Sequence, residues 1–347
     1  LVVAGSAGKL GSWNGRSAAW TLYSGSGVCD NATLIGAVSI NAMTIWTDPD
    51  GYPTLVVAGA GGKVGAMKIT GGVNWTFQTT PAHANNWYSI TYGNGIFVAI
   101  TQTNSTSTSV ATSPDGITWT FRTTPTMPSG TFYSIGYGNG LFIVMGTGGV
   151  SSQYFITSPD GINWTLRTLP AITSNLVTSI AYGNGVFVAV ANTNSTTNAI
   201  LYSNNGISWT FTTLSVAPSA SVGHGWRSVT YGNGLFVAVA YGASATNVIA
   251  TSTDGIIWTY RSSTAPGGQW VSVTYGNGLF VAVANTTSTT AGIATSPDGI
   301  TWTFRTTTAP AGSWSSVTYG NGLFVAIAYT TSTTAGIATS PDGITWT

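Results

Sequence analysis

The side chains that could carry acid–base or nucleophilic chemistry are few in this sequence of 347 residues. It holds eight aspartates, no glutamate, two histidines and one cysteine. Hydrolysis of a glycoside needs two carboxyl groups about 5–10 Å apart. Asp48 and Asp50 are close in sequence, but their Asp-Pro-Asp-Gly segment is typical of a turn. A divergent glycoside hydrolase is therefore the least favoured function.

The histidines and the cysteine do not form a recognisable catalytic or metal-binding pattern. His83 and His224 are isolated in loop-like segments, whereas nucleophilic catalysis needs a nucleophile beside a base. A zinc site needs a cluster of His and Cys, which the sequence lacks. Cys29 stands alone, so it is expected to be a small buried side chain rather than half of a disulfide. We expect no catalytic residue, no metal, no cofactor and no enzyme activity.

The elements that must position any site are clearest in residues 270–305. Four short runs rich in β-branched and aromatic residues, 270–275, 279–284, 292–295 and 300–305, are typical of strands. Asn-Gly joins the first two runs and Ser-Pro-Asp-Gly joins the last two, and both segments favour tight hairpin turns. The Asp side chain of the second turn can accept N–H groups of its own loop. These residues are therefore predicted to form a four-stranded antiparallel meander.

Side-chain alternation predicts how this meander is buried. The second strand is apolar on both faces, so both faces are expected to be covered. The fourth strand has one apolar and one polar face, so it should lie at the surface. The apolar face is expected to hold Ile300, Trp302 and Phe304, and the polar face Thr301, Thr303 and Arg305.

The meander recurs along the chain. A fixed period of this size, with four strands in each unit, predicts an all-β fold, a β-propeller of four-stranded antiparallel blades. A Tyr-Gly-Asn-Gly segment begins at tyrosines 92, 137, 182, 231, 275 and 319. The tryptophan of the fourth strand recurs at Trp119, Trp164, Trp209, Trp258, Trp302 and Trp346, and both series step by 45, 45, 49, 44 and 44 residues. The aspartate of the turn recurs as Asp115, Asp160, Asp254, Asp298 and Asp342.

The repeat predicts a single propeller domain over residues 1–347. The first blade lacks an inner strand, which we expect to precede Leu1. The sequence leaves seven or eight blades open, and eight is favoured because residues 1–23 would otherwise be an apolar sheet with open edges. Two divergent blades, 1–23 and 40–80, precede the regular repeats at 87–124, 132–169, 177–213, 226–263, 270–307 and 314–347.

Composition narrows the range of partners. Only 5% of the residues are charged and the net charge is +1, so the chain has no basic patch for nucleic acid. The longest apolar runs have the length of a strand, too short to cross a bilayer as a helix. We therefore expect no nucleic acid among the partners and no membrane insertion.

The turn that carries the aspartate resembles a known repeat. Ser113, Asp115, Gly116, Thr118 and Trp119 match in type the Asp-box of sialidase-like β-propellers, the bacterial neuraminidase repeat, with one residue fewer between Asp and Gly. This resemblance implies a propeller fold and a structural role for the boxes. The same short form recurs at 158–164, 296–302 and 340–346, with Thr253 for Pro at 252–258 and Asn205 for Asp at 203–209.

The resemblance also bears on activity. The sialidases of this family use three arginines, a tyrosine activated by a glutamate, and an aspartic acid, and a chain without glutamate departs from that set. Repeats with Tyr-Gly-Asn-Gly and Ser-Pro-Asp-Gly also resemble those of tail or fibre proteins of bacteriophages. This second resemblance implies a virion or an extracellular, cell-surface location, with other subunits of such an assembly as partners.

Four arginines occupy a repeated position, three residues after the tryptophan of the fourth strand. The copies around Trp75 and Trp209 lack both this arginine and the aspartate of the turn. Seven extended residues span roughly 23 Å, so a salt bridge between the two is excluded. The arginines are expected either to hydrogen-bond loop carbonyls with their stems packed on a neighbouring blade, or to form an anion- or sugar-binding rim. They are Arg122, Arg167, Arg261 and Arg305.

A second candidate site lies where the first strand of each unit begins. Aromatic faces beside Asn, Ser and Thr suit sugar rings, and variable loops on a rigid frame are where binding usually evolves. The alternative is that the rings pack between blades. An aromatic residue stands there as Trp87, Phe132, Trp226, Trp270 and Trp314, beside variable loops at 101–109, 147–153, 192–198, 241–247 and 285–291.

The function expected from these features is a non-enzymatic, lectin-like propeller of a virion fibre or extracellular surface assembly. It would act as an adhesin, recognising cell-surface glycans through the face that carries the variable loops. The alternative is a purely structural spacer of a phage tail or extracellular assembly.

Overall fold

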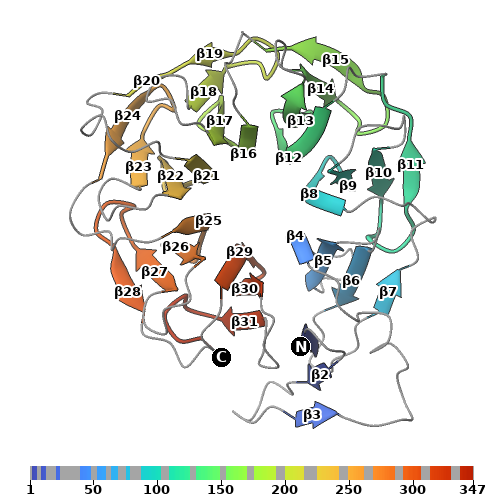
Figure 1. The fold of residues 1–347 in the computed structure, drawn as a ribbon, viewed down its shortest axis with the longest axis vertical. Helices are drawn as coiled ribbons and strands as arrows, with labels where there is room; N and C mark the ends of the chain where they lie inside the picture. Colours follow the sequence, from blue (N-terminus) through green and yellow to red (C-terminus); the bar gives the residue numbers. More distant parts are fainter. Residues whose placement is uncertain are drawn as a thin grey trace.

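The computed structural model of the chain contains strands and turns, and no helix, in the residues that it describes. The strands form antiparallel meanders of three or four strands that are arranged in a ring (Figure 1), and one parallel strand pair and one antiparallel residue pair join two of them into a larger sheet. The described residues are 2–5, 9–12, 21–23, 40–47, 53–59, 64–68, 76–78, 87–102, 109–125, 130–148, 154–169, 176–192, 200–214, 225–241, 249–261, 269–285, 292–305, 313–329 and 337–346.

Seven strands form the inside of the ring around one axis. Each of them packs beside the next, and the last packs beside the first, so the ring is closed. We number the blades 1–7 by these inner strands, which are β4 (Ile40–Thr47), β8 (Trp87–Gly93), β12 (Gly130–Gly138), β16 (Leu176–Gly183), β21 (Gly225–Gly232), β25 (Trp270–Gly276) and β29 (Ser313–Gly320).

The remaining strands of each blade follow outward in chain order. The second strands are β5 (Pro53–Gly59), β9 (Ile96–Thr101), β13 (Leu141–Gly148), β17 (Val186–Asn192), β22 (Leu235–Tyr241), β26 (Leu279–Ala284) and β30 (Leu323–Tyr329). The third strands are β6 (Val64–Lys68), β10 (Val110–Ser113), β14 (Tyr154–Ser158), β18 (Ile200–Ser203), β23 (Ile249–Ser252), β27 (Ile293–Ser296) and β31 (Ile337–Ser340). The fourth strands are β7 (Thr76–Gln78), β11 (Thr120–Arg122), β15 (Thr165–Thr168), β19 (Thr210–Phe211), β24 (Ile257–Tyr260) and β28 (Thr303–Arg305).

The N-terminal strands form a separate sheet. β1 (Val2–Gly5), β2 (Lys9–Ser12) and β3 (Thr21–Tyr23) pair with one another, and Figure 1 shows them outside the inner ring, near the junction of blades 7 and 1. Since β29 packs directly beside β4, this sheet adds no strand around the axis. The inner ring therefore has seven members, rather than the eight that the sequence favoured.

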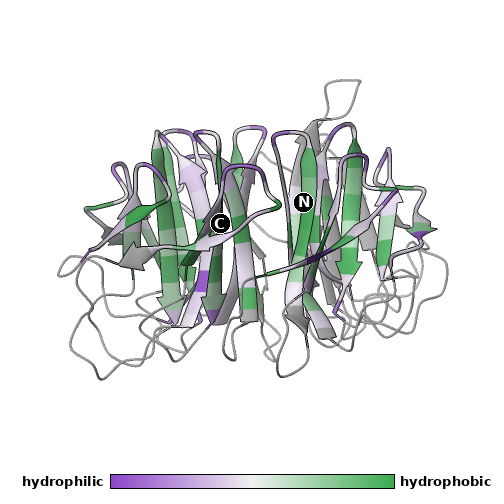
Figure 2. Ribbon diagram, turned by 90° about the horizontal axis from the view of Figure 1, so that it is seen from above, coloured by the Kyte–Doolittle hydropathy of each residue, from purple (hydrophilic) through white to green (hydrophobic). Residues whose placement is uncertain are grey.

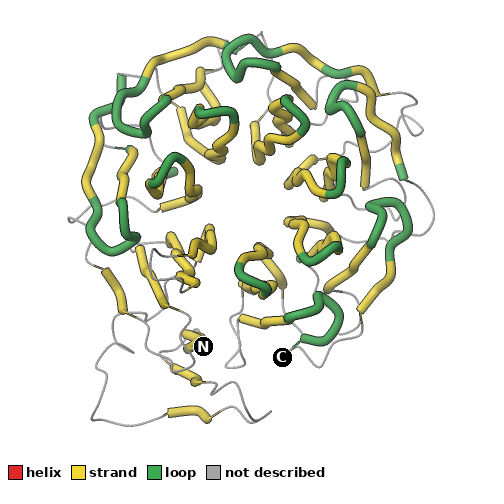
Figure 3. The backbone as a smooth tube through the Cα atoms, turned by 180° about the vertical axis from the view of Figure 1, so that it is seen from behind, coloured by secondary structure: helices red, strands yellow, loops and turns green. Residues whose placement is uncertain are grey.

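The two kinds of turn take the conformations that their sequences predict. In blade 6, Asn277 and Gly278 both have positive φ, 48° and 75°, as a two-residue hairpin turn requires. Gly299, at the end of the Asp turn, has φ 71°. The same values recur in the other regular blades. Figure 3 shows these turns as an inner and an outer set around the axis.

The fourth strand is shorter than predicted. In blade 6 it begins at Thr303, and Ile300 is 41% exposed rather than packed with Trp302. The reason is local: the N–H groups of Ile300 and Thr301 both bond the Asp298 carboxylate, so they cannot join the strand ladder. The predicted burial of Trp302 is confirmed, since it is 4% exposed.

The hydrophobic core lies between the blades, where each sheet packs against the next. Both faces of β26 are covered, as predicted: Val281 packs with Trp314 and Phe324 of blade 7, while Phe280 packs with residues of blade 5. Figure 2 shows the apolar strands running through the depth of the ring. The core is thus divided into similar compartments, one for each junction between blades.

The Tyr-Gly-Asn-Gly segment also joins neighbouring blades. The Tyr319 ring packs on Phe324 of its own blade, with ring centroids 4.5 Å apart, and lies against Gly276 of the blade before. A Cβ atom at Gly276 would fall inside the Tyr319 ring. The first Gly of the segment therefore serves the contact between blades, whereas the second serves the turn. The same contact joins Gly93 to Tyr137, Gly138 to Tyr182, Gly183 to Tyr231 and Gly232 to Tyr275.

Blades 4 and 5 are joined more closely than the others. After β19 the chain of blade 4 crosses to β20 (Thr213–Leu214), which pairs in parallel with β24 of blade 5. A single residue pair, Asn192 with Gly225, also links β17 to β21, and Tyr241 with Gln269 forms the equivalent bridge between blades 5 and 6. This junction involves blade 4, one of the two copies in which the sequence has neither the turn aspartate nor the arginine.

Candidate functional site

The Asp turn is a closed hydrogen-bonded unit. In blade 6 the Asp298 Oδ1 accepts the Ser296 hydroxyl at 2.9 Å and the N–H groups of Ile300 and Thr301 at 2.8 and 2.7 Å. The Trp302 Nε1 donates to the Gly299 carbonyl at 3.1 Å. The carboxylate is therefore occupied in holding its own turn, as predicted. Asp115, Asp160, Asp254 and Asp342 make the same bonds in their blades.

Blade 4 makes the same turn without a charge. Asn205 Oδ1 accepts the N–H groups of Ile207 and Ser208 at 2.9 and 2.8 Å, and Trp209 Nε1 donates to the Gly206 carbonyl at 3.3 Å. The turn thus needs an acceptor oxygen at this position rather than an acid. This geometry assigns the repeated aspartates and tryptophans to the structure of the blades.

We expect acid to weaken these turns. Hydrogen bonding from the Asn163 backbone, opposed by partial burial and aided by the Asn163 side chain, holds the pKa of Asp160 well below its usual 3.8. Because the folded pKa lies below the unfolded one, the turn contributes stability above pH 3.8 that is lost as the pH falls through the folded pKa. The guanidinium concentration at the unfolding midpoint should therefore decrease as the pH is lowered from about 5 to about 2. The variant D115N/D160N/D254N/D298N/D342N should fold and lose most of this dependence; an unchanged acid response would contradict the assignment.

The four repeated arginines bond a threonine on the neighbouring strand of their own blade. Arg305 Nε donates to Thr295 Oγ1 at 2.8 Å, and the partner is neither the turn aspartate nor a loop carbonyl. The expectation of loop carbonyls is thus wrong for Nε. Blade 4 has Thr212 and Tyr202 at these two positions, so the arginine and its threonine are absent together. The other pairs are Arg122 with Thr112 at 2.7 Å, Arg167 with Thr157 at 3.4 Å and Arg261 with Thr251 at 2.8 Å.

A groove adjoins the first of these arginines at the outer edge of the ring. It has a volume of about 550 Å³ and lies between the end of β11 and the Asp turn of blade 3. Its lining residues include Arg122, Phe121, Asn163 and Trp164. Asn163 is engaged there, since its side chain donates to Asp160 at 2.8 Å. An anion-binding rim stays a prediction.

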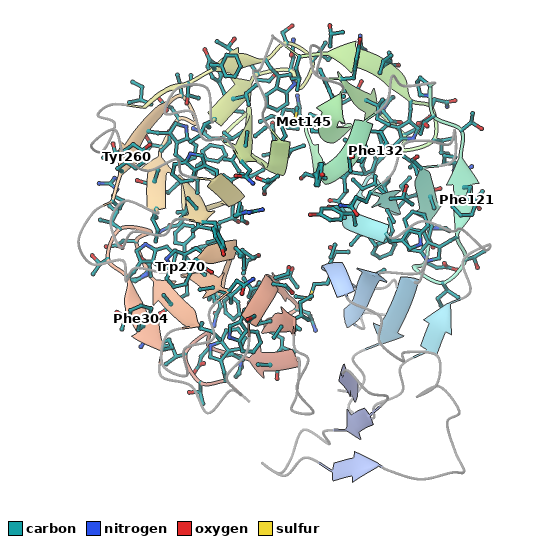
Figure 4. All side chains as sticks on the ribbon, viewed as in Figure 1. Phe121, Phe132, Met145, Tyr260, Trp270 and Phe304 are labelled. Carbon is teal, nitrogen blue, oxygen red and sulfur yellow. The ribbon has the colours of Figure 1, made fainter. Side chains whose placement is uncertain are left out.

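The aromatic residues at the start of the inner strands are buried. Trp87 and Trp270 are 0% exposed, and both stack within their own blade, on Phe121 and Phe304, with ring centroids 5.9 and 6.2 Å apart. In Figure 4, Phe132 and Trp270 lie within the body of the ring. These aromatic side chains therefore pack inside the ring, which was the alternative prediction, and they offer no exposed face to a sugar. The full set is Trp87, Phe132, Trp226, Trp270 and Trp314, none more than 2% exposed.

A feature that sequence reasoning missed follows directly after these aromatic residues. In every blade the pairing of the inner strand with the second strand is interrupted there by a β-bulge, which leaves one residue outside the ladder. A bulge re-aims the side chain that it carries. The bulged residues are Asn41, Tyr88, Tyr133, Thr178, Arg227, Val271 and Ser315.

Two of the bulged side chains are in contact, and a third lies within electrostatic range of one of them. The Tyr88 and Tyr133 rings, from blades 2 and 3, contact each other edge to face with centroids 5.3 Å apart. Burial raises the pKa of Tyr88, Tyr133 raises it further, and the positive charge of Arg227 lowers it. Arg227 belongs to blade 5, so it can act on Tyr88 only from across the axis. We call Tyr88, Tyr133 and Arg227 the axial cluster.

The guanidinium of Arg227 lies over one aromatic ring, and one of its donors meets no acceptor among the described residues. Its Cζ lies 5.3 Å from the centroid of the Tyr241 ring, at the end of β22 in its own blade. Its Nε is buried, and among the described residues it meets no hydrogen-bond acceptor. A buried donor without a partner costs about 1–3 kcal/mol. A ligand that supplied an acceptor here would recover that cost.

The wall around the cluster is fastened by serines that follow the bulges. Ser179 Oγ accepts the Val229 N–H of the next inner strand at 3.2 Å. Ser228 and Ser272 accept equivalent N–H groups at 3.2 and 3.1 Å. The inner strands of blades 4 and 5, of blades 5 and 6, and of blades 6 and 7 are therefore joined side chain to backbone next to their bulges. A Ser stands at this position in six blades and Ala42 in blade 1.

Other candidate groups fall partly outside the described structure. His83, His224, Cys29, Asp48 and Asp50 lie outside the described residues, as do most of the variable loops. Among the described side chains, no group of three or more His, Cys, Asp and Glu is placed to hold a metal ion. The part of the chain that is described also has no helix long and apolar enough to span a membrane.

Comparison with known proteins supports the fold. No family model matches the chain, and no curated protein matches its sequence. Similar solved structures include catalytically inactive virginiamycin B lyase from Staphylococcus aureus with quinupristin, at 14% identity over 84% of this chain and 92% of that chain, with a TM-score of 0.66. YCF48 bound to a D1 peptide is similar at 13% identity over 87% and 92%, with a TM-score of 0.61. The computationally designed Ika8 follows at 12% identity over 88% and 84%, with a TM-score of 0.58.

These likenesses define the class of protein and overturn the predicted function. The chain is an all-β propeller built from repeats, and at such low identity the likeness extends to the fold alone. The prediction of a glycan-recognising or purely structural propeller of a virion fibre or surface assembly is wrong. The similar structures named here are a lyase, a protein bound to a peptide and a computational design, so they give no support for a virion or glycan-binding role. The aromatic residues assigned to the glycan surface are buried.

Proposed function

We propose that the chain is a non-catalytic binding propeller whose axial cluster takes a segment of another protein. The observation that carries this proposal is the contact of Tyr88 with Tyr133 at neighbouring bulges, together with the charge of Arg227, which acts on Tyr88 from a third blade. These residues stand at equivalent bulges of similar blades, yet they differ from the residues at the other bulges. Among the described residues, no hydrogen bond uses their polar groups to hold the blades together, so we take these groups as available to a ligand.

The position of the cluster favours an extended segment as the ligand. The bulges stand where the inner strands begin, and seven packed strands surround them. A chain end or a loop is slim enough to reach side chains at the axis, whereas the flat surface of a folded domain is not. YCF48, whose fold is similar, was solved with a bound peptide, which makes peptides the first ligand class to test. The absence of enzyme activity belongs to this proposal, and an extracellular location stays a prediction.

The proposal is tested by selecting peptides on the immobilised protein. Two random heptapeptide libraries would be used, one with free C-termini and one with the random segment inside a longer chain. We expect enriched peptides that bind the wild type. Charged hydrogen bonds are worth about 1.5–3 kcal/mol, so Arg227→Gln should weaken binding about 10- to 100-fold by fluorescence anisotropy.

The control is Ser315→Ala, which alters the bulge of blade 7 and removes a hydroxyl that bonds the Ile327 carbonyl. It should change the affinity by less than about twofold, because that hydroxyl is already engaged within its own blade. No enrichment from either library, or equal binding by the Arg227→Gln variant and the wild type, would overturn the proposal.

A further inference from the structure

Resting on the proposed function, the geometry points to a carboxylate as the group that the axial cluster binds. It can come from the C-terminus of a chain or from an Asp or Glu side chain, because the two offer the same pair of oxygens. Arg227 supplies the charge, and the hydroxyls of Tyr88 and Tyr133 supply neutral donors.

The arrangement of Arg227 leaves the right donors free. A guanidinium over an aromatic ring uses its face, as Arg227 does over Tyr241, and its N–H groups lie in its own plane. Those N–H groups form a planar fork that matches the two oxygens of a carboxylate. The Nε donor is buried and meets no acceptor among the described residues, so it gains a partner only if the side chain shifts when the ligand binds. Tyr241 acts here as a positioning residue.

The two phenols add donors without adding charge. The net effect of burial, Tyr133 and Arg227 raises the pKa of Tyr88, so its hydroxyl keeps its proton at neutral pH and can donate. The Tyr133 ring meets that of Tyr88 edge to face, which fixes both rings from neighbouring blades. Two half-buried rings also present apolar edges to the carbon atoms of a ligand.

Charge balance favours a carboxylate over a phosphate. The cluster contains one cation, which one carboxylate neutralises, whereas a phosphate close to two negative charges would be only half compensated. The five described aspartates do not neutralise Arg227 themselves. Their turns adjoin the Asn-Gly turns, as the pairing of Ser113 with Phe97 shows, whereas the bulges lie at the other end of the inner strands.

The test removes carboxylates one at a time from a peptide selected on the wild-type protein. Amidation of its C-terminus, or replacement of each Asp by Asn and each Glu by Gln, is followed by fluorescence anisotropy. We expect one of these changes to weaken binding to the wild type about 10- to 100-fold. The same change should weaken binding to the Arg227→Gln variant less than about threefold, because the partner of that carboxylate is gone. The position of the sensitive carboxylate distinguishes a chain end from a side chain.

Two outcomes would overturn the inference while leaving the proposed function intact. The first is a peptide that needs Arg227 but loses less than about threefold in affinity when all its carboxylates are removed. The second is displacement of the peptide by inorganic phosphate at concentrations where acetate has no effect. Arg227→Lys gives a further check, since it keeps the charge but not the fork and should recover only part of the lost affinity.

Discussion

Replacing Gly276 with alanine is expected to destabilise the ring by about 3 kcal/mol or more. A Cβ atom at this position would fall within the Tyr319 ring of blade 7, at the base of that ring rather than at its flexible end. Tyr319 cannot withdraw, because Phe324 packs on it with ring centroids 4.5 Å apart. The junction between blades 6 and 7 would have to open. The midpoint of guanidinium unfolding measures the loss.

The matched control for this change lies two residues along the chain. Gly278 has open space around its Cα and a φ of 75°, so Gly278→Ala costs only the strain of a left-handed residue, about 1–2 kcal/mol. Equal midpoints for the two variants would mean that the first Gly serves only the turn. That result would contradict the contact between blades.

Replacing Trp302 with alanine is expected to cost about 3–5 kcal/mol, because a large buried ring leaves a cavity that the blades cannot fill. Trp302 is 4% exposed, and its Nε1 bonds Gly299 at 3.1 Å, so both the core and the Asp turn lose a contact. The comparison variant is Arg305→Ala, three residues further along the chain, at the end of β28. Arg305 is half-buried and donates one hydrogen bond to Thr295, worth about 1 kcal/mol. Equal unfolding midpoints for the two variants would refute this ranking.

The sequence predicted the architecture well because the repeat carries it. Each copy combines a two-residue hairpin turn, an Asp turn and a second strand that is apolar on both faces, and these features determine a blade. The hydrogen bonds of the Asp turn could also be predicted, because the Asp298 carboxylate accepts N–H groups of its own loop. The length of the fourth strand could not be predicted. The N–H groups of Ile300 and Thr301 can bond either Asp298 or the neighbouring strand, and the geometry of the turn decides for Asp298.

The number of blades and the candidate site depended on contacts that sequence alone does not supply. Closure at seven follows from the packing of β29 beside β4, which are far apart in the chain. From the sequence alone, the rings of Trp87 and Trp270 were as compatible with sugar binding as with packing. Their burial in the structure excludes sugar binding. The axial cluster did leave a signal: Tyr88, Tyr133 and Arg227 occupy the one inner-strand position that changes most between copies. This position could be recognised as a candidate site only once the strand pairing showed the bulge, and no local sequence pattern predicts that bulge.

The central claim is that Tyr88, Tyr133 and Arg227, which stand at equivalent bulges of a closed ring of seven blades, form the ligand site. The most direct measurement is a crystal structure of the chain with a selected peptide. We predict peptide density at the axis, with a carboxylate within hydrogen-bond distance of Arg227 and of at least one of the two tyrosines. Peptide density at the outer groove beside Arg122, or on the Asp turns with the axis empty, would contradict the account.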